Sequence, residues 1–231
     1  MLGLIFTGGD KPDTQFIKQL IKTQVKDALY IAADSGLIAA ENAGLKPDWI
    51  IGDMDSIKDP SILDSYPGRI IRYDHNKDFT DTELAFSLAI EKGCNDVWII
   101  GGGGGRIDHL FGIRSLFERD NFPSRWITAN EDIYCIDSFI AKNSIEKKLD
   151  KGISVSVFPL GDGAWEAQSS GLKWPLIDLP WDRGFFGLSN VAVDGSFSIT
   201  AINGRFMIIL PLYSSKDSHR GTKAQRTRRK L

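Results

Sequence analysis

The feature that most restricts the possible folds of this chain is a series of short apolar runs, each followed by a polar or glycine-containing phrase. The runs lie at 2–6, 29–33, 48–51, 69–73, 96–100 and 125–129. They lack strict alternation, which predicts strands buried on both faces of a parallel sheet that helices cover. Helical segments are expected near 13–26, 35–43, 81–92 and 109–119. These patterns predict an α/β N-terminal domain with a mostly parallel sheet flanked by helices.

The pattern changes near residue 130, where helical periodicity disappears. Apolar and polar residues alternate at 153–158, 191–193 and 197–200, an apolar run follows at 205–210, and turn signals such as Asn203-Gly204 separate these segments. This pattern predicts a smaller all-β antiparallel sandwich domain. We therefore expect three parts: an α/β domain at 1–129, a β-sandwich at 130–213, and a basic, disordered tail at 214–231.

Aspartates recur directly after three of the expected strands. They occur in Asp53-Met54-Asp55-Ser56, Asp78-Phe79-Thr80-Asp81 and Gly105-Arg106-Ile107-Asp108-His109. The carboxyl ends of parallel strands meet at one edge of a sheet, so these side chains should converge. Closely packed carboxylates repel one another unless a divalent cation lies between them. The pattern predicts a magnesium-dependent enzyme that acts on phosphate.

Helix capping offers a simpler explanation for each phrase taken alone. An Asp-x-Asp after a strand is common in turns, and Asp78 and Asp81 precede a helical segment that they could cap. Three such phrases in βα connections of the same domain favour a binding site over capping alone. His109, at the expected start of a helix, is more typical of a capping or packing residue.

The expected phosphate-binding elements are glycine-rich turns. The chain lacks the P-loop sequence, and Arg106 stands where a dinucleotide-binding fingerprint would have its third glycine. Glycines at 101–105 would let backbone N–H groups approach phosphate oxygens, and Arg106 would offer a fork of donors. The turn at 6–10 is either a second phosphate or ribose contact or an ordinary βα turn.

Several phrases together resemble the thiamine pyrophosphokinase family over about residues 2–212. In the first domain they are Ala33-Asp34-Ser35-Gly36, the segments 47–56 and 76–81, and Gly104-Gly105-Arg106-Ile107-Asp108-His109. In the second they are Gly171-Leu172-Lys173-Trp174-Pro175-Leu176 and Gly187-Leu188-Ser189-Asn190. The resemblance implies transfer of the diphosphate group of ATP to the hydroxyethyl group of thiamine, which gives thiamine diphosphate and AMP.

The resemblance also assigns roles to individual residues. Catalysis and the binding of Mg²⁺ (or Mn²⁺) are expected of Asp53, Asp55, Asp78 and Asp81, and Arg106 is expected to hold phosphate oxygens. Contacts with ATP are expected from Asp34, Ser35, Gly36, Ser56, Lys77, Thr80, Gly104, Gly105 and Asp108. Contacts with thiamine are expected from Trp174, Trp181, Ser189 and Asn190, with Trp181 preferred because Pro180-Trp181-Asp182 has the composition of an exposed loop. The family's thiamine pocket forms between subunits, so a homodimer with shared active sites is expected.

Composition places limits on location and partners. The chain has 231 residues, of which 42% are hydrophobic, and no apolar stretch approaches the roughly 20 residues of a membrane span. Cys94 and Cys135 are expected to be reduced core residues, which favours a cytoplasmic protein. Residues 216–231 carry a net charge of +6, so with a whole-chain charge of −2 the remainder carries −8. An acidic body makes nucleic acid an unlikely partner despite the basic tail.

Two other functions remain consistent with the aspartate phrases. One is a pyrophosphokinase of another small alcohol, such as a pterin-type alcohol, or a metal-dependent phosphohydrolase on the same scaffold. The other is a non-catalytic nucleotide-binding sensor whose basic tail binds nucleic acid. Formation of AMP that depends on both ATP and thiamine would distinguish these alternatives from the thiamine enzyme.

Overall fold

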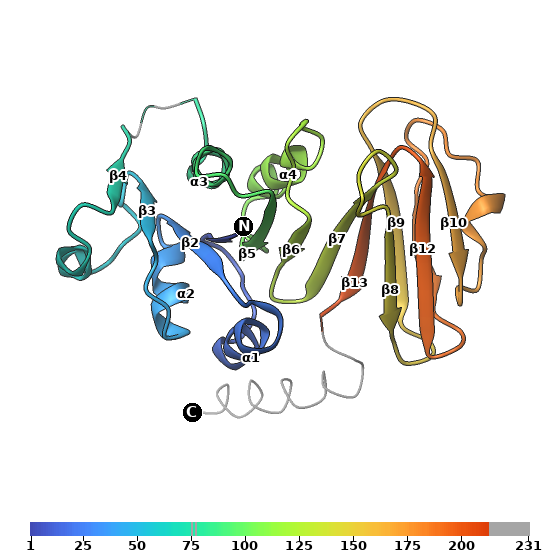
Figure 1. Cartoon of the computed structure of the whole chain (residues 1–231), viewed down its shortest axis with the longest axis horizontal. Coiled ribbons are helices and arrows are strands. Elements are labelled where there is room, and N and C mark those ends of the chain that lie inside the picture. The colour runs from blue at the N-terminus through green and yellow to red at the C-terminus, as the bar shows by residue number, and fades with distance from the viewer. Residues whose placement is uncertain (75, 77, 213–231) are drawn as a thin grey trace, which may run out of the picture. The chain divides into compact units, whose positions relative to one another are not determined.

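The computed structural model describes residues 1–74, 76 and 78–212 (Figure 1). Its internal contacts divide the chain into an N-terminal unit that ends at Ala129 and a C-terminal unit that begins at Asn130. Lys77 and the expected basic tail at 214–231 lie outside the described residues.

The described part of the N-terminal unit contains six parallel strands in the order β6-β5-β1-β2-β3-β4 (Figure 1). They are β1 (Leu2–Phe6), β2 (Ala28–Ala33), β3 (Trp49–Gly52), β4 (Ile70–Arg72), β5 (Asp96–Ile100) and β6 (Arg125–Ile127). Leu4, Ile5 and Phe6 of the central strand β1 are fully buried, as expected for a strand covered on both faces.

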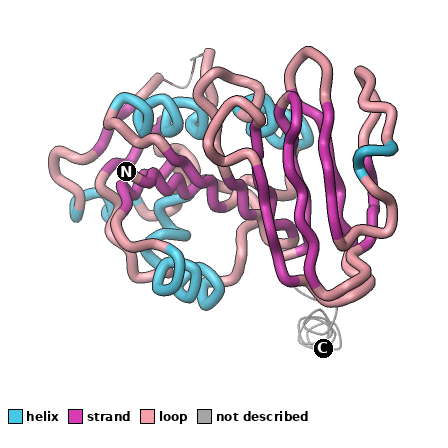
Figure 2. The backbone as a smooth tube through the Cα atoms, turned by 45° about the vertical axis from the view of Figure 1, so that its right-hand side comes forward, coloured by secondary structure: helices cyan, strands magenta, loops and turns pink. Residues whose placement is uncertain are grey.

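Helices cover both faces of this sheet. Figures 1 and 2 show α1 (Thr14–Gln24) and α2 (Gly36–Asn42) on one side, and α3 (Asp81–Glu91) and α4 (Ile107–Leu116) on the other. A short 3-10 helix, η1 (Pro60–Ser65), precedes β4. The α1 helix begins where the Asp13 carboxylate accepts a hydrogen bond from the Phe16 N–H at 2.8 Å, and it buries Ile17 and Leu20.

The strand order reverses beside β1. From β1 the chain adds β2, β3 and β4 on one side, and it then returns to place β5 on the other side of β1. Such a reversal separates the loops that follow the two neighbouring strands, and ligands of open α/β sheets bind in that gap. The turn after β1 and the glycine run after β5 lie at this position.

The C-terminal unit consists of two antiparallel sheets, ordered β11-β9-β13-β7 and β10-β12-β8. Its elements are β7 (Glu131–Asp137), β8 (Ser144–Lys148), β9 (Ser154–Leu160), β10 (Glu166–Ser170), the 3-10 helix η2 (Leu176–Asp178), β11 (Gly187–Val191), β12 (Ser196–Asn203) and β13 (Arg205–Pro211). Both sheets contribute to one core, in which Val157 and Phe206 meet Phe197 and Ile199. The predicted fold class, an α/β domain followed by an antiparallel sandwich, is confirmed.

Several strand predictions in the C-terminal unit were wrong or incomplete. The expected strand at 191–193 lies instead at Gly187–Val191, and strands β7, β8 and β10 were not predicted. Cys94 and Cys135 are buried free thiols. Among the described helices, none has the length and apolar character needed to cross a membrane.

Candidate active site

A cavity of about 510 Å³ opens at the carboxyl-terminal edge of the parallel sheet. Its lining comes from the turns after β1, β2, β3 and β5 and from the first residues of α3 and α4. Every lining residue belongs to the N-terminal unit, between Thr7 and Ile113. The cavity therefore occupies the position that the reversal of strand order makes available to a ligand.

Three carboxylates gather on one side of the cavity. One oxygen each of Asp34, Asp53 and Asp55 lies within 4.8 Å of the other two. Asp34 has a left-handed backbone (φ 47°), as does Met54 (φ 67°), a conformation that persists in L-residues only where the surroundings enforce it. Within the described chain, Oδ1 of Asp34 is buried without a hydrogen-bond partner. A buried, unsatisfied carboxylate oxygen beside two further carboxylates fits the oxygen ligands of a divalent cation.

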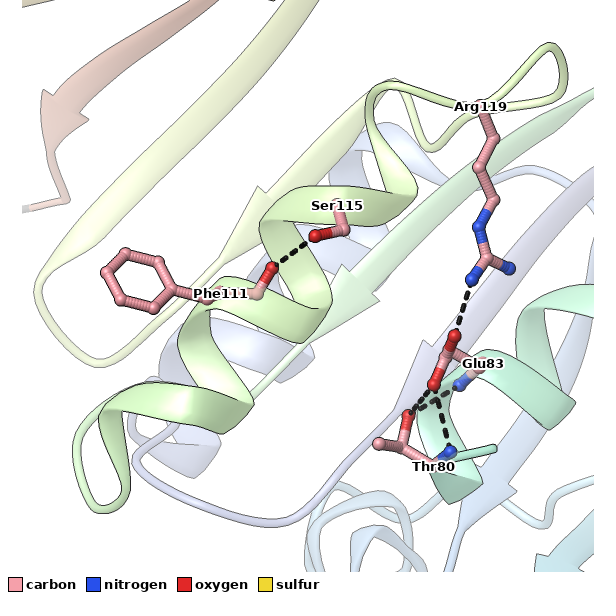
Figure 3. Close-up of polar contacts among 5 residues, drawn as sticks. All are labelled: Thr80, Glu83, Phe111, Ser115 and Arg119. Atoms are coloured by element: carbon pink, nitrogen blue, oxygen red, sulfur yellow. Dashed lines mark hydrogen bonds and ion pairs between the residues drawn. The ribbon is translucent and has the colours of Figure 1, made fainter. Parts of the chain in front are cut away.

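The start of α3 adds Thr80 and Asp81 to the lining. Thr80 and Glu83 form a capping box: the Glu83 N–H donates to Thr80 Oγ1 at 3.2 Å, and the Thr80 N–H donates to the Glu83 carboxylate at 2.9 Å (Figure 3). A Cβ at Gly52 would lie 3.0 Å from the Asp81 carboxyl and 3.3 Å from Asp34 Cβ. The absence of a side chain at Gly52 therefore lets Asp81 approach the end of β3 beside the other carboxylates.

Glu83 itself is held in the ionised form. Burial favours a higher pKa for Glu83, but hydrogen bonds from Thr80 and the ion pair with Arg119 outweigh it and lower the pKa below its ordinary value. The next position of α3, Thr82, is buried, and its hydroxyl lies 2.7 Å from the Thr7 hydroxyl. This bond fastens the start of α3 to the turn after β1.

The glycine run after β5 forms the opposite wall. The N–H groups of Gly102 and Gly103 donate to the carbonyls of Gly8 and Asp10 at 2.6 and 3.0 Å, which joins this run to the turn after β1. Gly104 is left-handed (φ 61°), and a Cβ there would overlap the Asp10 carboxylate. Within the described residues, the N–H groups of Gly104 and Gly105 donate no hydrogen bond. They are therefore available to anionic oxygens in the cavity.

Arg106 follows the glycines and lines the cavity with a largely exposed guanidinium. Its Nε donates to Asp108 Oδ1 at 3.1 Å and its Nη2 to Oδ2 at 2.5 Å. These bonds raise the pKa of Arg106 and lower the pKa of Asp108 from their ordinary values. Asp108 thus orients the guanidinium, which keeps further N–H groups for phosphate oxygens.

Most of the residues predicted for catalysis and ATP binding do meet in this cavity. Those in its lining are Asp34, Ser35, Asp53, Asp55, Ser56, Thr80, Asp81, Gly104, Gly105 and Arg106. Gly36 lies behind it, packed against the end of β1, and Asp108 contacts it only through Arg106. Asp78 is exposed and does not line it, so the described carboxylate group contains Asp34 where the sequence predicted Asp78. Thr80 is the N-cap of α3, and the helix therefore places Asp81, three residues after Asp78, in the lining of the cavity.

Other lining residues were missed or given another role. The turn Thr7-Gly8-Gly9 lines the cavity, so its position is compatible with the phosphate or ribose contact that the sequence left open for it. His109 also lines the cavity, although its position at a helix start favoured capping or packing. Phe79 lines it with a ring that is 55% exposed. Phe79 stands inside the phrase Asp78-Phe79-Thr80-Asp81, and this position was the only indication from the sequence that it lies near the site.

The predicted thiamine contacts lie in the C-terminal unit. Asn190 is buried, and its amide is used within the sandwich: Oδ1 accepts from the Trp174 N–H at 3.1 Å, and Nδ2 donates to the Trp174 carbonyl at 2.6 Å. Ser189 is exposed with a left-handed backbone (φ 55°), and its N–H donates to Ser156 Oγ at 3.0 Å. Asn190 therefore holds the Trp174 segment against β11.

The two tryptophans differ from the expected order. Trp181 is half-buried, packs edge-on against Phe206, and donates its indole N–H to the Leu176 carbonyl at 2.9 Å. Trp174 is 48% exposed, with the Lys173 ammonium 4.4 Å from its ring centroid. Pro180 and Asp182 are exposed as expected of a loop, but the Trp181 ring is packed inward, and Trp174 is the more accessible aromatic ring of the pair.

Comparisons with known proteins agree on one family. A family model described as thiamin pyrophosphokinase, catalytic domain, matches residues 20–124. Thiamine pyrophosphokinase of Bacillus subtilis (strain 168) is 31% identical over 178 residues, which cover 74% of this chain and 80% of the relative. Thiamine pyrophosphokinase 1 of Oryza sativa subsp. japonica is 25% identical over 167 residues, 68% of this chain and 63% of the relative.

Solved structures share the fold. The crystal structure of thiamine pyrophosphokinase from Bacillus subtilis matches with a TM-score of 0.71 at 23% identity, covering 91% of this chain and 99% of that one. Thiamin pyrophosphokinase from Candida albicans matches with a TM-score of 0.67 at 15% identity, covering 92% and 89%. At these identities the likeness extends to the arrangement of helices and strands.

Proposed function

The chain belongs to the thiamine pyrophosphokinase family, and we propose that it transfers the diphosphate group of ATP to the hydroxyethyl oxygen of thiamine, giving thiamine diphosphate and AMP. The observation that carries this assignment is one cavity in which a group of carboxylates faces a turn with unused glycine N–H groups. Carboxylates facing phosphate-binding amides suit transfer from a nucleotide through a bound divalent cation.

Asp34, Asp53 and Asp55 are the residues that we assign to Mg²⁺, or to Mn²⁺ in its place. Their clustered oxygens, and the unsatisfied Oδ1 of Asp34, fit a small hard cation that takes oxygen ligands. When bound, the cation supplies charge neutralisation for the triphosphate. The sequence had assigned Asp53, Asp55, Asp78 and Asp81 to this role, so the proposal exchanges Asp78 for Asp34 and gives Asp81 another task.

The glycine turn and Arg106 hold the phosphate oxygens. The N–H groups of Gly104 and Gly105 approach without steric hindrance, and the guanidinium of Arg106, oriented by Asp108, supplies a directional fork. Fixing the triphosphate in this way aligns the β-phosphorus for attack from the opposite side. Positioning of this kind is the main contribution of a protein to phosphoryl-type transfer.

Asp81 is the residue that we assign as acceptor of the hydroxyl proton. It lines the cavity next to the group formed by Asp34, Asp53 and Asp55. The hydroxyethyl oxygen of thiamine forms a bond to the β-phosphorus, the bond from that phosphorus to the oxygen of AMP breaks, and the alcohol proton moves to the carboxylate. AMP leaves with a negative charge, and the guanidinium of Arg106 faces that charge.

The assay that tests this function measures AMP in reactions with ATP, Mg²⁺ and thiamine, together with reactions that omit one component. We expect AMP and thiamine diphosphate in equal amounts, and neither product without thiamine. Phosphate release from ATP without thiamine would indicate the phosphohydrolase, and AMP formed only with a pterin-type alcohol would indicate the other pyrophosphokinase. The same assay applied to Asp55→Asn tests the group of carboxylates. Asp162→Asn, in an exposed turn of the sandwich, is the matched control for that variant.

We further propose a homodimer in which the sandwich of one subunit supplies thiamine contacts, Trp174 among them, to the cavity of the other. The proposal is supported by a cavity whose lining, among residues 1–74, 76 and 78–212, comes from the N-terminal unit, and by an exposed Trp174 in the C-terminal unit. Mixing inactive Asp55→Asn and Trp174→Ala proteins should restore up to about a quarter of wild-type activity after random exchange of subunits. No recovery despite demonstrated exchange would place each site within one chain.

A further inference from the structure

An ion pair outside the cavity is attached to one of its walls. The Glu83 carboxylate uses its two oxygens separately: Oε2 accepts from the N–H and hydroxyl of Thr80 at 2.9 and 3.0 Å, and Oε1 accepts from Arg119 Nη2 (Figure 3). The Glu83 side chain is 17% exposed and that of Arg119 is 40% exposed. Arg119 follows the end of α4, so the pair links the C-terminal end of α4 to the N-terminal end of α3.

The two helices connected by this pair both contribute to the cavity. The start of α3 provides Thr80 and Asp81, and the start of α4 provides Arg106 and His109. The capping box alone is sufficient to begin α3, because Thr80 and Glu83 satisfy each other's N–H groups. Helix initiation therefore does not require the bond to Arg119. The effect of that bond is to fix α3 relative to α4.

The pair also fixes the orientation of the Glu83 side chain. Glu83 lies two residues after Asp81 in α3, so the two side chains leave the helix in different directions. Arg119 neutralises Glu83 and holds it in the orientation that caps the helix.

We propose that Arg119 and Glu83 are positioning residues, which act through Thr80 and Asp81 to hold the α3 wall of the nucleotide and metal site. The inference rests on the proposed function for its kinetic consequences, but its effect on the binding of Mg²⁺ and ATP does not require turnover. Neither side chain lines the cavity, so neither is assigned a contact with substrate.

The test compares Arg119→Ala, Arg119→Lys and Glu83→Gln with the control Arg114→Ala. Arg114 Nη1 pairs with Glu118 Oε1 at 2.9 Å along the same helix, and that pair lies outside the cavity lining. Calorimetry with Mg²⁺ and ATP in the absence of thiamine gives the affinity of the site. Steady-state rates give kcat and the KM for each substrate, and melting temperatures report any general loss of stability.

We expect Arg119→Ala and Glu83→Gln to weaken Mg²⁺-ATP binding and kcat/KM for ATP about tenfold, the effect of a lost charge-assisted hydrogen bond. The KM for thiamine and all values for Arg114→Ala should stay within about twofold of wild type. Arg119→Lys should recover part of the loss, because lysine restores the charge without the planar fork. The loss in the double variant Arg119→Ala with Glu83→Gln should be smaller than the sum of the two single losses, because both changes remove the bond between these two residues.

An affinity in Arg119→Ala equal to that in Arg114→Ala would overturn the inference, as would two single losses that add in the double variant. If Arg119→Ala does not fold, the comparison of Arg119→Lys with wild type decides. A wild-type protein that binds Mg²⁺ and ATP but forms no AMP with thiamine would refute the proposed function, and the affinities would still test the positioning role.

Discussion

Replacing Asp34 by Asn should make the protein more stable without metal and less responsive to metal. The substitution keeps the size of the side chain and removes one of three charges whose oxygens lie within 4.8 Å of one another. Asn adopts the left-handed region about as readily as Asp, so the backbone at φ 47° adds no new strain.

The magnitude follows from the spacing of the carboxylates. Two unit charges at this separation repel by about 1 kcal/mol in water and by about 3.5 kcal/mol at an effective dielectric constant near 20. We therefore expect the free energy of unfolding of Asp34→Asn in chelator to exceed that of wild type by roughly 1–3 kcal/mol. Since 1 kcal/mol shifts the melting temperature of a chain this long by roughly 2–4 °C, the rise should be about 2–12 °C.

Added Mg²⁺ should reduce the stability advantage of Asp34→Asn over wild type. A cation that binds only the folded state at a hundred times its Kd stabilises that state by about 2.7 kcal/mol. Wild type should gain this amount, and Asp34→Asn should gain less because it has lost a ligand. Scanning calorimetry in chelator and across a Mg²⁺ titration measures both effects, with Asp162→Asn as the exposed control. A variant that melts below wild type in chelator would refute the reasoning, because it would mean that the Asp34 charge is stabilised in the apo protein.

Three further outcomes are expected. Asp81→Asn should lower kcat by at least about a hundredfold while keeping the stabilisation by Mg²⁺. Asp78→Asn should keep activity within about threefold of wild type. Equal losses of activity in the two variants would contradict the separate roles of Asp78 and Asp81. Trp126→Phe removes an indole N–H that donates to the glycine turn at 2.7 Å, so the KM for ATP should rise about fivefold with little change in the KM for thiamine. Burial raises the pKa of Cys135 to about 12, so at pH 8 this thiol should react with Ellman's reagent only after unfolding.

The N-terminal unit could be predicted from the sequence almost element by element, because a strand covered on both faces has to be continuously apolar. The expected strand at 96–100 coincides with β5, and the helix expected at 81–92 is α3 to within one residue. The sandwich was harder to predict. In β10 only Ala167 is buried among polar neighbours, and β8 reads Ser-Ile-Glu-Lys-Lys with Ile145 as its buried residue. One inward side chain in five residues is too weak a signal of alternation.

The position of the cavity could be predicted in outline, but two features of its geometry and of the sandwich could not. Sequence alone shows that Asp34 follows a strand, but its closeness to Asp53 depends on the pairing of β2 with β3. Trp181 stands between Pro180 and Asp182, whose types indicate an exposed loop, yet its ring packs on Phe206. The types of the neighbouring residues indicate that a backbone segment is exposed. They do not determine whether a large side chain in that segment points to solvent or to the core.

The sequence of the phrase at 78–81 is consistent both with helix capping and with catalysis. In the structure, the capping residues and the carboxylate in the cavity belong to the same helix start. Thr80 becomes the N-cap because its hydroxyl meets the Glu83 N–H, and this makes Asp81 the first helical residue. The backbone of Asp81 is then fixed by the helix, while its carboxyl stands beside Gly52 in the cavity. A residue whose backbone is fixed in the first turn of a helix has fewer orientations open to its side chain. The capping box therefore supplies the rigidity that a catalytic carboxylate needs, and for that reason an ion pair that fixes Glu83 is expected to affect the binding of nucleotide.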